Sequence, residues 1–188
     1  MDVAGELVSL RHLIPTDAQP LLDLRLANRE FFRPLEPTVG EFHFTLEGQL
    51  ADITRLDEER ANDESYVFGI FENASDALVG RIGLSAVFRK AWQNANLGYY
   101  VAQEHNGRGF GTEAVILASR YAFGQARLHR VQAAVMLDNV ASKRVLEKAG
   151  FRHEGLARKY LKINDRWEDH HIYALTVEDR EGGSGAES

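Results

Sequence analysis

Three glycines stand within five positions at residues 107–111, and a pattern typical of a helix follows them. A turn needs one or two glycines, so three indicate backbone that stays bare for another molecule to approach. The first amides of a helix have no partner inside the helix, and the helix dipole adds partial positive charge there. A phosphate could therefore bind on these amides, with Arg108 supplying a full positive charge.

The spacing of the glycines excludes two common phosphate-binding loops. No Gly-Lys-Ser/Thr follows, as a Walker loop requires, and no third glycine completes the dinucleotide pattern G-x-G-x-x-G. The stretch also follows a meander of predicted strands, whereas a Rossmann turn belongs to an opening unit. A glycine-rich turn between a strand and a helix can also serve only to reverse the chain, so both interpretations stay open from spacing alone.

The glycine turn joins a predicted strand at 95–101 to a predicted amphipathic helix at 112–128. Apolar alternation and turn signals predict six more strands. These are 6–13, 66–71, 77–88, 129–137, 154–164 and 166–177. Further helices are expected within 15–28, 41–61 and 139–151, the first opening with a capping box at Thr16 and Gln19. The pattern predicts a mixed α/β domain around one central sheet.

Composition limits the class of protein. With 188 residues, 44% of them hydrophobic, the chain can build one sizeable core, expected at residues 1–178, whereas the acidic, glycine-rich residues 179–188 are expected to be a disordered tail. There is no cysteine, no secretory signal and no apolar run of transmembrane length, so we expect a cytoplasmic protein without a membrane partner. The net charge of −6 argues against nucleic-acid binding.

Four segments carry a resemblance to a known family. Asn106–Gly111 resembles the acyl-coenzyme A signature Gln/Arg-x-x-Gly-x-Gly/Ala of the GNAT superfamily of N-acetyltransferases, with Asn106 replacing the usual first residue. Residues 138–151 resemble the superfamily segment Asn-x-x-Ser/Ala…Glu-Lys-x-Gly-Phe. Residues 28–37 and 164–175 resemble two motifs of the bacterial ribosomal-protein-alanine N-alpha acetyltransferases, with Leu35 replacing a tryptophan in the first. The resemblance spans residues 7–177.

The resemblance implies a fold and a donor. The fold is a single central, mostly antiparallel twisted sheet of about seven strands, flanked by helices, with a V-shaped splay between two parallel strands. The donor is acetyl-CoA, its pantetheine arm on the open strand edge and its pyrophosphate on the glycine turn; no metal is implied. The residues expected to bind it are Tyr99, Tyr100, Val101, Asn106, Gly107, Arg108, Gly109, Phe110, Gly111, Thr112, Asn139, Ser142 and Lys143.

Direct acetyl transfer from a thioester to an amine has three chemical needs. The amine must be neutral, the carbonyl oxygen needs a donor as charge develops, and the departing thiolate benefits from a proton. A backbone amide of 99–101 is expected at the carbonyl. Many relatives place a tyrosine at the position of Leu146, so Ser142, one turn earlier, becomes the candidate thiolate donor; alternatively it only bonds the helix backbone.

The sequence leaves the base open. Glu104, Glu154, Asp169 and His170 could each take a proton, or each could be a solvated surface group, and an amine of lowered pKa needs no dedicated base. His170 and His171 are not expected to bind one metal ion, because adjacent strand residues point to opposite faces.

The acceptor site is expected near the first ribosomal-type motif and the last hairpin. Its candidate residues are Phe31, Phe32, Glu36 and Asp169. The resemblance favours a protein N-terminal α-amine as acceptor. A small-molecule amine, such as a polyamine, an aminoglycoside or an amino-acid-like compound, is the first alternative, and a non-catalytic acyl-CoA-binding regulatory module is the second. A homodimer is common among such relatives.

Overall fold

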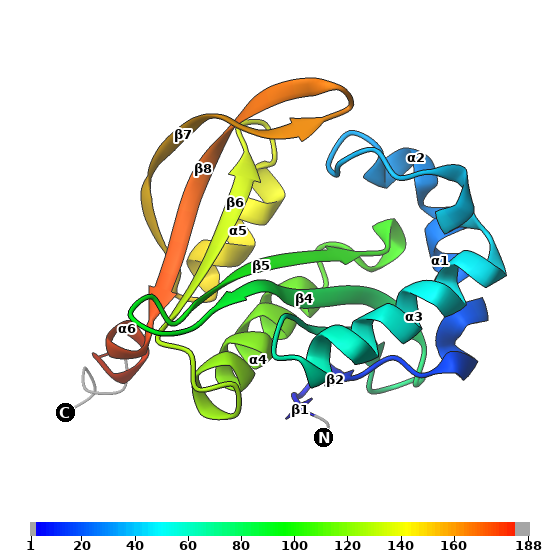
Figure 1. Ribbon diagram of the computed structural model, residues 1–188, viewed down its shortest axis with the longest axis horizontal. Coiled ribbons are helices and arrows are strands. Elements are labelled where there is room, and N and C mark those ends of the chain that lie inside the picture. Colours follow the sequence, from blue (N-terminus) through cyan, green and yellow to red (C-terminus); the bar gives the residue numbers. More distant parts are fainter. Residues whose placement is uncertain (1–2, 183–188) are drawn as a thin grey trace.

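One twisted eight-stranded sheet organises the chain in this computed structural model, which describes residues 3–182 (Figure 1). The strands are β1 Val3–Ala4, β2 Val8–Arg11, β3 Tyr66–Glu72, β4 Leu78–Phe88, β5 Asn94–Val101, β6 Arg130–Met136, β7 Arg152–Ile163 and β8 Arg166–Thr176. Their order across the sheet is β1-β2-β3-β4-β5-β6-β8-β7. The predicted fold is confirmed, and the eighth strand is the two-residue β1, too short to produce its own alternating pattern.

All neighbouring strands are antiparallel except β5 and β6, which are parallel. Their pairing begins at Asn94 opposite Arg130 and ends at Asn96 opposite Gln132. The opposite edge of β5 stays paired with β4 as far as Val101. The remainder of β5, residues 97–101, therefore has no ladder partner on the side of β6, and the sheet opens there.

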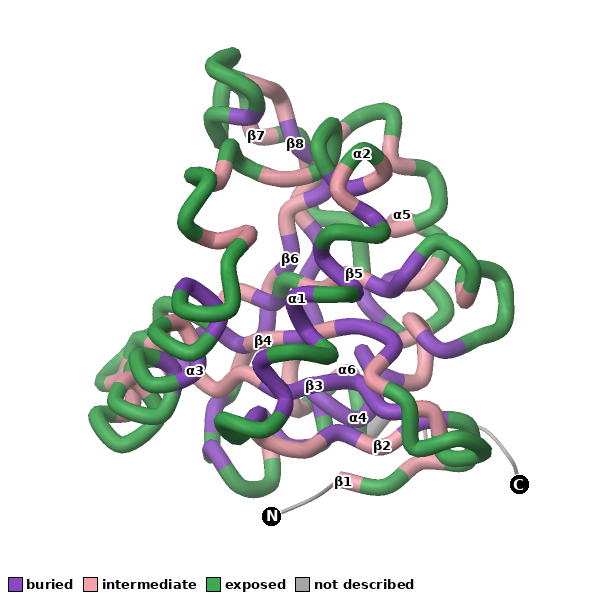
Figure 2. Tube along the Cα trace, turned by 90° about the vertical axis from the view of Figure 1, so that its right-hand side faces the viewer, coloured by how far each residue is buried: buried purple, intermediate pink, exposed green. Residues whose placement is uncertain are grey.

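Helices cover both faces of the sheet. The helical elements are η1 Pro15–Asp17, α1 Ala18–Ala27, α2 Arg29–Phe32, η2 Glu41–Phe44, α3 Leu46–Ala61, η3 Gln103–His105, α4 Phe110–Gly124, α5 Val140–Lys148 and α6 Val177–Gly182. Because side chains alternate along β3, this strand contributes to a hydrophobic core on each face of the sheet. Phe68 and Ile70 pack in the core under α4. Phe71 packs on the other face with Leu21 of α1 and Ile53 of α3. Figure 2 shows the buried segments gathered in the central strands.

The predicted capping box at Thr16 and Gln19 is wrong. Gln19 donates instead to Asp23, and the Asp17 carboxylate accepts the amide of Ile14 at 2.8 Å while also pairing with Arg11. The chain therefore turns through η1 before α1 begins.

The first strands are tied to the first turn of α4. The Glu113 carboxylate accepts the backbone amides of Glu6, Leu7 and Val8, each at 2.7 Å. Gly5 leaves room for this carboxylate, since a Cβ there would lie 2.6 Å from Cδ of Glu113 and would displace the Glu113 side chain. The turn between β1 and β2 and the start of α4 consequently form one rigid unit.

The end of the described chain is helical. Thr176 donates its amide to Asp179 at 3.0 Å, and α6 extends over Val177–Gly182, so residues 179–182 of the expected tail are ordered as a helix. The rest of that predicted tail, 183–188, lies outside the described residues. Within residues 3–182, none of the helices combines the length and apolar character needed to cross a bilayer.

Candidate active site

The glycine turn leaves the start of α4 bare. Gly107 and Gly109 have φ of +78° and +88°, the left-handed region that favours glycine, and Gly109 is the N-cap of α4 with no side chain capping the helix. A Cβ on Gly107 would meet nothing within 4 Å. The Phe110 ring is buried beneath the turn, so this residue offers only backbone to the surface. The turn therefore fits a diphosphate, which would find unoccupied amides and no Cβ in its path.

The Arg108 side chain is already paired with groups beside the glycine turn. Its guanidinium lies 2.6 Å from the Glu72 carboxylate at the end of β3, 2.9 Å from Nδ1 of His105, and 4.5 Å over the Phe110 ring. Hydrogen bonds from Ser75 and then from Arg108 lower the pKa of Glu72. The charge of Arg108 is therefore already paired, and the helix start supplies the positive field of the turn.

The open edge of β5 presents one tyrosine to each face of the sheet. Tyr99 points toward α5, where its hydroxyl lies 3.0 Å from Oγ of Ser142, and burial raises its pKa to about 12. The Ser142 amide donates to Oδ1 of Asn139, which caps α5. The alternative reading of Ser142, a side chain bonded to its own helix backbone, is thus not what the structure contains. Leu146, one turn on, is fully buried and apolar.

Lys143 and Thr112 complete the predicted donor site. The Lys143 ammonium donates to the carbonyl of Leu137 at 2.6 Å, which closes the turn between β6 and α5. Thr112 is half-buried in the first turn of α4, next to Gly111. A Cβ on Gly111 would meet Tyr99 and Val145 at ordinary contact distances of 3.6 and 3.7 Å.

Tyr100 points to the opposite face and meets the predicted acceptor residues. Its ring lies 4.8 Å from the buried ring of Phe32, which in turn contacts Phe31. The Arg25 guanidinium lies 5.0 Å from the centre of the Tyr100 ring. Its side chain is only 2% exposed, so it is shielded from solvent. Its two terminal nitrogens donate to Glu36 at 2.9 and 2.5 Å. Burial opposes this charge, but the Glu36 carboxylate outweighs it and raises the pKa of Arg25.

The β7–β8 hairpin extends beyond the sheet toward α2 (Figure 1). Near its tip, the Asn164 side chain donates to the carbonyl of Arg33 at 2.8 Å. Asp169, predicted as an acceptor residue, accepts the amide of Lys159 at 2.8 Å and so holds the bulged part of the hairpin. A cavity of about 630 Å³ lies along the hairpin. It is lined by Lys159, Arg166, Trp167 and Glu168.

None of the four predicted bases makes a hydrogen bond to Tyr99, Tyr100 or Ser142 among the residues described. The Glu104 side chain is 81% exposed, and His170 is buried with Nδ1 3.0 Å from the Glu168 carbonyl. Both oxygens of Glu154 accept from Arg130, at 2.8 and 2.6 Å. The hydrogen bond from Arg130 lowers the pKa of Glu154, which makes it a poorer base at neutral pH.

Sequence reasoning missed Arg25 and the partner of Ser142. Arg25 follows Leu21 by four positions, on the buried side of α1, and that spacing was the available signal. Within the described residues, no cluster of three or more metal-ligating side chains is present.

Comparisons with known proteins show which family the chain is similar to. Residues 8–152 match the family described as acetyltransferase (GNAT) domain. The chain is 45% identical over 177 residues to "Probable N-acetyltransferase YjcK" of Bacillus subtilis, covering 94% of this chain and 98% of that relative. It is 34% identical over 163 residues to the ribosomal protein uS5-alanine N-acetyltransferase of Escherichia coli, covering 87% and 84%. The solved structure of Mycobacterium smegmatis RimJ in complex with CoA-disulfide superposes with a TM-score of 0.87 at 30% identity, covering 92% and 83%.

Proposed function

This chain belongs to the GNAT acetyltransferase family and uses acetyl-CoA as its donor, and on that basis we propose that its acceptor is a protein N-terminal α-amine of the ribosomal type. The observation that carries the proposal is the 34% identity over 87% of the chain to an enzyme named for acetylating the alanine of ribosomal protein uS5. The motif at 28–37 supports it, since Glu36 and Phe32 of that motif surround Arg25 and Tyr100. Cytoplasm is the compartment that such an acceptor implies.

The glycine turn positions the donor in this proposal. The amides of 107–112 bind its diphosphate, and the unpaired edge of 97–101 bonds its pantetheine arm as an added strand would. A backbone amide at 99–101 donates to the thioester carbonyl oxygen as negative charge develops there. Because these groups are main-chain atoms of a sheet and a helix start, they need no rearrangement during the reaction.

Ser142 and Tyr99 serve the leaving group. Tyr99 stays protonated at neutral pH, because burial raises its pKa to about 12. Its hydroxyl lies 3.0 Å from Oγ of Ser142, and in this proposal Tyr99 is the donor of the pair, so that the Ser142 hydrogen points at the thiolate sulfur. Asn139 fixes the Ser142 backbone by capping α5. The linked hydroxyls of Tyr99 and Ser142 thus take the proton-donating role that a single tyrosine has in many relatives.

The test is an acceptor panel assayed by release of free thiol. Acetyl-CoA is supplied with peptides that carry N-terminal alanine or serine, with the same peptides blocked at the N-terminus, and with spermidine and an aminoglycoside. Turnover of the free peptides, with acetyl located on the α-amine by fragmentation mass spectrometry, is the expected result. Turnover of the small amines alone would overturn the proposal, and calorimetric binding of acetyl-CoA without any turnover would favour a regulatory module.

A further inference from the structure

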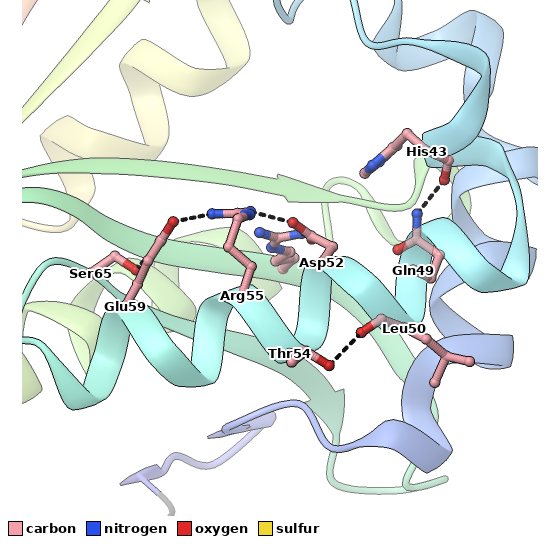
Figure 3. Close-up of polar contacts among 9 residues, drawn as sticks. His43, Gln49, Leu50, Asp52, Thr54, Arg55, Glu59 and Ser65 are labelled. Atoms are coloured by element: carbon pink, nitrogen blue, oxygen red, sulfur yellow. Dashed lines mark hydrogen bonds and ion pairs between the residues drawn. The ribbon is translucent and has the colours of Figure 1, made fainter.

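A half-buried histidine lies on the same face of the sheet as Tyr100. His43 belongs to η2, and its carbonyl oxygen accepts the side-chain amide of Gln49 from α3. In Figure 3 the imidazole points away from Gln49. No hydrogen bond joins its ring nitrogens to another described residue. The backbone of His43 is therefore held firmly while its ring remains free to accept a proton.

Charged groups from four elements act electrostatically on this ring. They are Arg25 from α1, Glu36 from the loop after α2, Asp52 from α3 and Arg81 from β4. Arg81 is the direct cross-strand partner of Tyr100, and Arg25 lies 5.0 Å over the Tyr100 ring. We infer that the imidazole lies on the face of the sheet that carries Tyr100 and the predicted acceptor residue Phe32. This face includes β5, the strand whose open edge is proposed to hold the thioester.

The carboxylates around His43 are committed to other partners. Glu36 accepts twice from Arg25, and Asp52 accepts from Arg81 at 2.6 Å and also from Arg55. Burial opposes the charge of Asp52, but Arg81 and Arg55 outweigh it and lower its pKa, which makes Asp52 a poor proton acceptor. Of these three side chains, only the His43 imidazole has ring nitrogens without a hydrogen bond to a described residue, and imidazoles exchange protons near neutral pH.

We propose that His43 is the general base that deprotonates the acceptor amine, an assignment that rests on the proposed function. The neutral imidazole removes one proton from the R–NH₃⁺ acceptor, whose nitrogen then forms the new N–C bond as the C–S bond breaks. Ser142 gives its proton to the thiolate, and the second proton that leaves the amide nitrogen replaces it on Ser142. The sum is R–NH₃⁺ plus thioester giving acetamide, free thiol and one proton released through His43.

The environment favours the neutral ring. Burial lowers the pKa of His43, and the positive charge of Arg25 lowers it further. The base is therefore active above this lowered pKa and is lost as the pH falls through it. In the wild-type enzyme, kcat/KM should decline on the acid side with an apparent pKa below 6.5.

The experiment uses H43Q and H43A with whichever amine the wild-type enzyme acetylates. Both variants should lose about 100-fold in kcat, keep the wild-type affinity for acetyl-CoA by calorimetry, and lose the acid limb of the pH profile. Added imidazole should restore part of the rate of H43A, which a purely structural defect would not allow. H129Q is the matched control, because His129 pairs with Glu178 of α6, and it should behave as wild type.

Three results would overturn the assignment. These are a persistent acid limb in H43Q, a rate within threefold of wild type, and a raised KM for the amine with unchanged kcat. If the enzyme acetylates a small amine but no peptide, the proposed acceptor fails while the His43 test proceeds with that amine. If no amine is acetylated, both proposals fall.

Discussion

Replacing Glu36 with glutamine should destabilise the fold far more than an ordinary ion-pair mutation. The Arg25 side chain is 2% exposed and both of its terminal nitrogens donate to Glu36, whereas Glu36 itself is 25% exposed. Removing one partner of a buried pair costs about 3–5 kcal/mol, because the other charge stays buried without compensation. Partial exposure of Glu36, and the amide oxygen that glutamine keeps, reduce our expectation to about 2–3 kcal/mol.

Urea and thermal denaturation at pH 7 measure this change. For a chain of this size about 1 kcal/mol corresponds to roughly 2–4 °C in Tm, so E36Q should melt about 4–12 °C below wild type. The matched control is E41Q, since Glu41 pairs with Arg29 at the surface, where both side chains are well exposed. That control should show no measurable change in Tm.

The double variant R25M/E36Q separates the buried charge from lost packing. Methionine fills much of the space of the arginine stem without a charge, so the double variant should be more stable than E36Q alone. Two results would refute the reasoning that the buried Arg25 charge needs Glu36 for stability. One is an E36Q protein with the same Tm as E41Q, and the other is a double variant that is less stable than E36Q.

Three further predictions follow from the donor site and the core. G107A should fold, at a cost of about 1 kcal/mol for its positive φ, yet bind acetyl-CoA about tenfold more weakly in calorimetry; unchanged affinity would argue against the bare-amide cradle. S142A should lower kcat by about 10- to 100-fold without changing the KM for acetyl-CoA, and Y99F should have a smaller effect in the same thiol-release assay. Burial lowers the pKa of His12, so the stabilisation from its neutral ring is present above pH 6.5 and is lost as the pH falls through the lowered pKa. H12Q should therefore lose less Tm than wild type as the pH falls below 6.5. A decline in Tm equal to that of wild type would contradict this prediction.

Local patterns in the sequence were sufficient for the donor side of the site. Gly107 and Gly109 can adopt the positive φ that other residues avoid, so a tight, bare turn before the helix could be predicted from residue types alone. The alternation in 95–101 likewise identified the strand that carries Tyr99 and Tyr100. Both features depend on neighbours within a few positions.

Partners distant in sequence could not be predicted in the same way. Arg108 was expected at the phosphate, but Glu72, 36 positions earlier, pairs with it once β3 and the glycine turn meet. Glu154 faces Arg130 for the same reason, because β6 and β7 are brought together by β8 between them. Nothing in the local pattern at His43 indicates the charges of α1, α3 and β4 that surround it. Charged side chains choose partners by tertiary proximity, which spacing along the chain does not encode.

The hydrogen bonds of the Glu113 carboxylate affect the order in which parts of the fold form during synthesis. Its partners, the amides of Glu6, Leu7 and Val8, leave the ribosome 105 to 107 residues before it does. At about 5–20 residues per second, the turn between β1 and β2 waits roughly 5–20 seconds for the group that closes it. The β1–β2 end of the sheet is thus completed only after α4 is synthesised, although residues 6–8 are translated well before it.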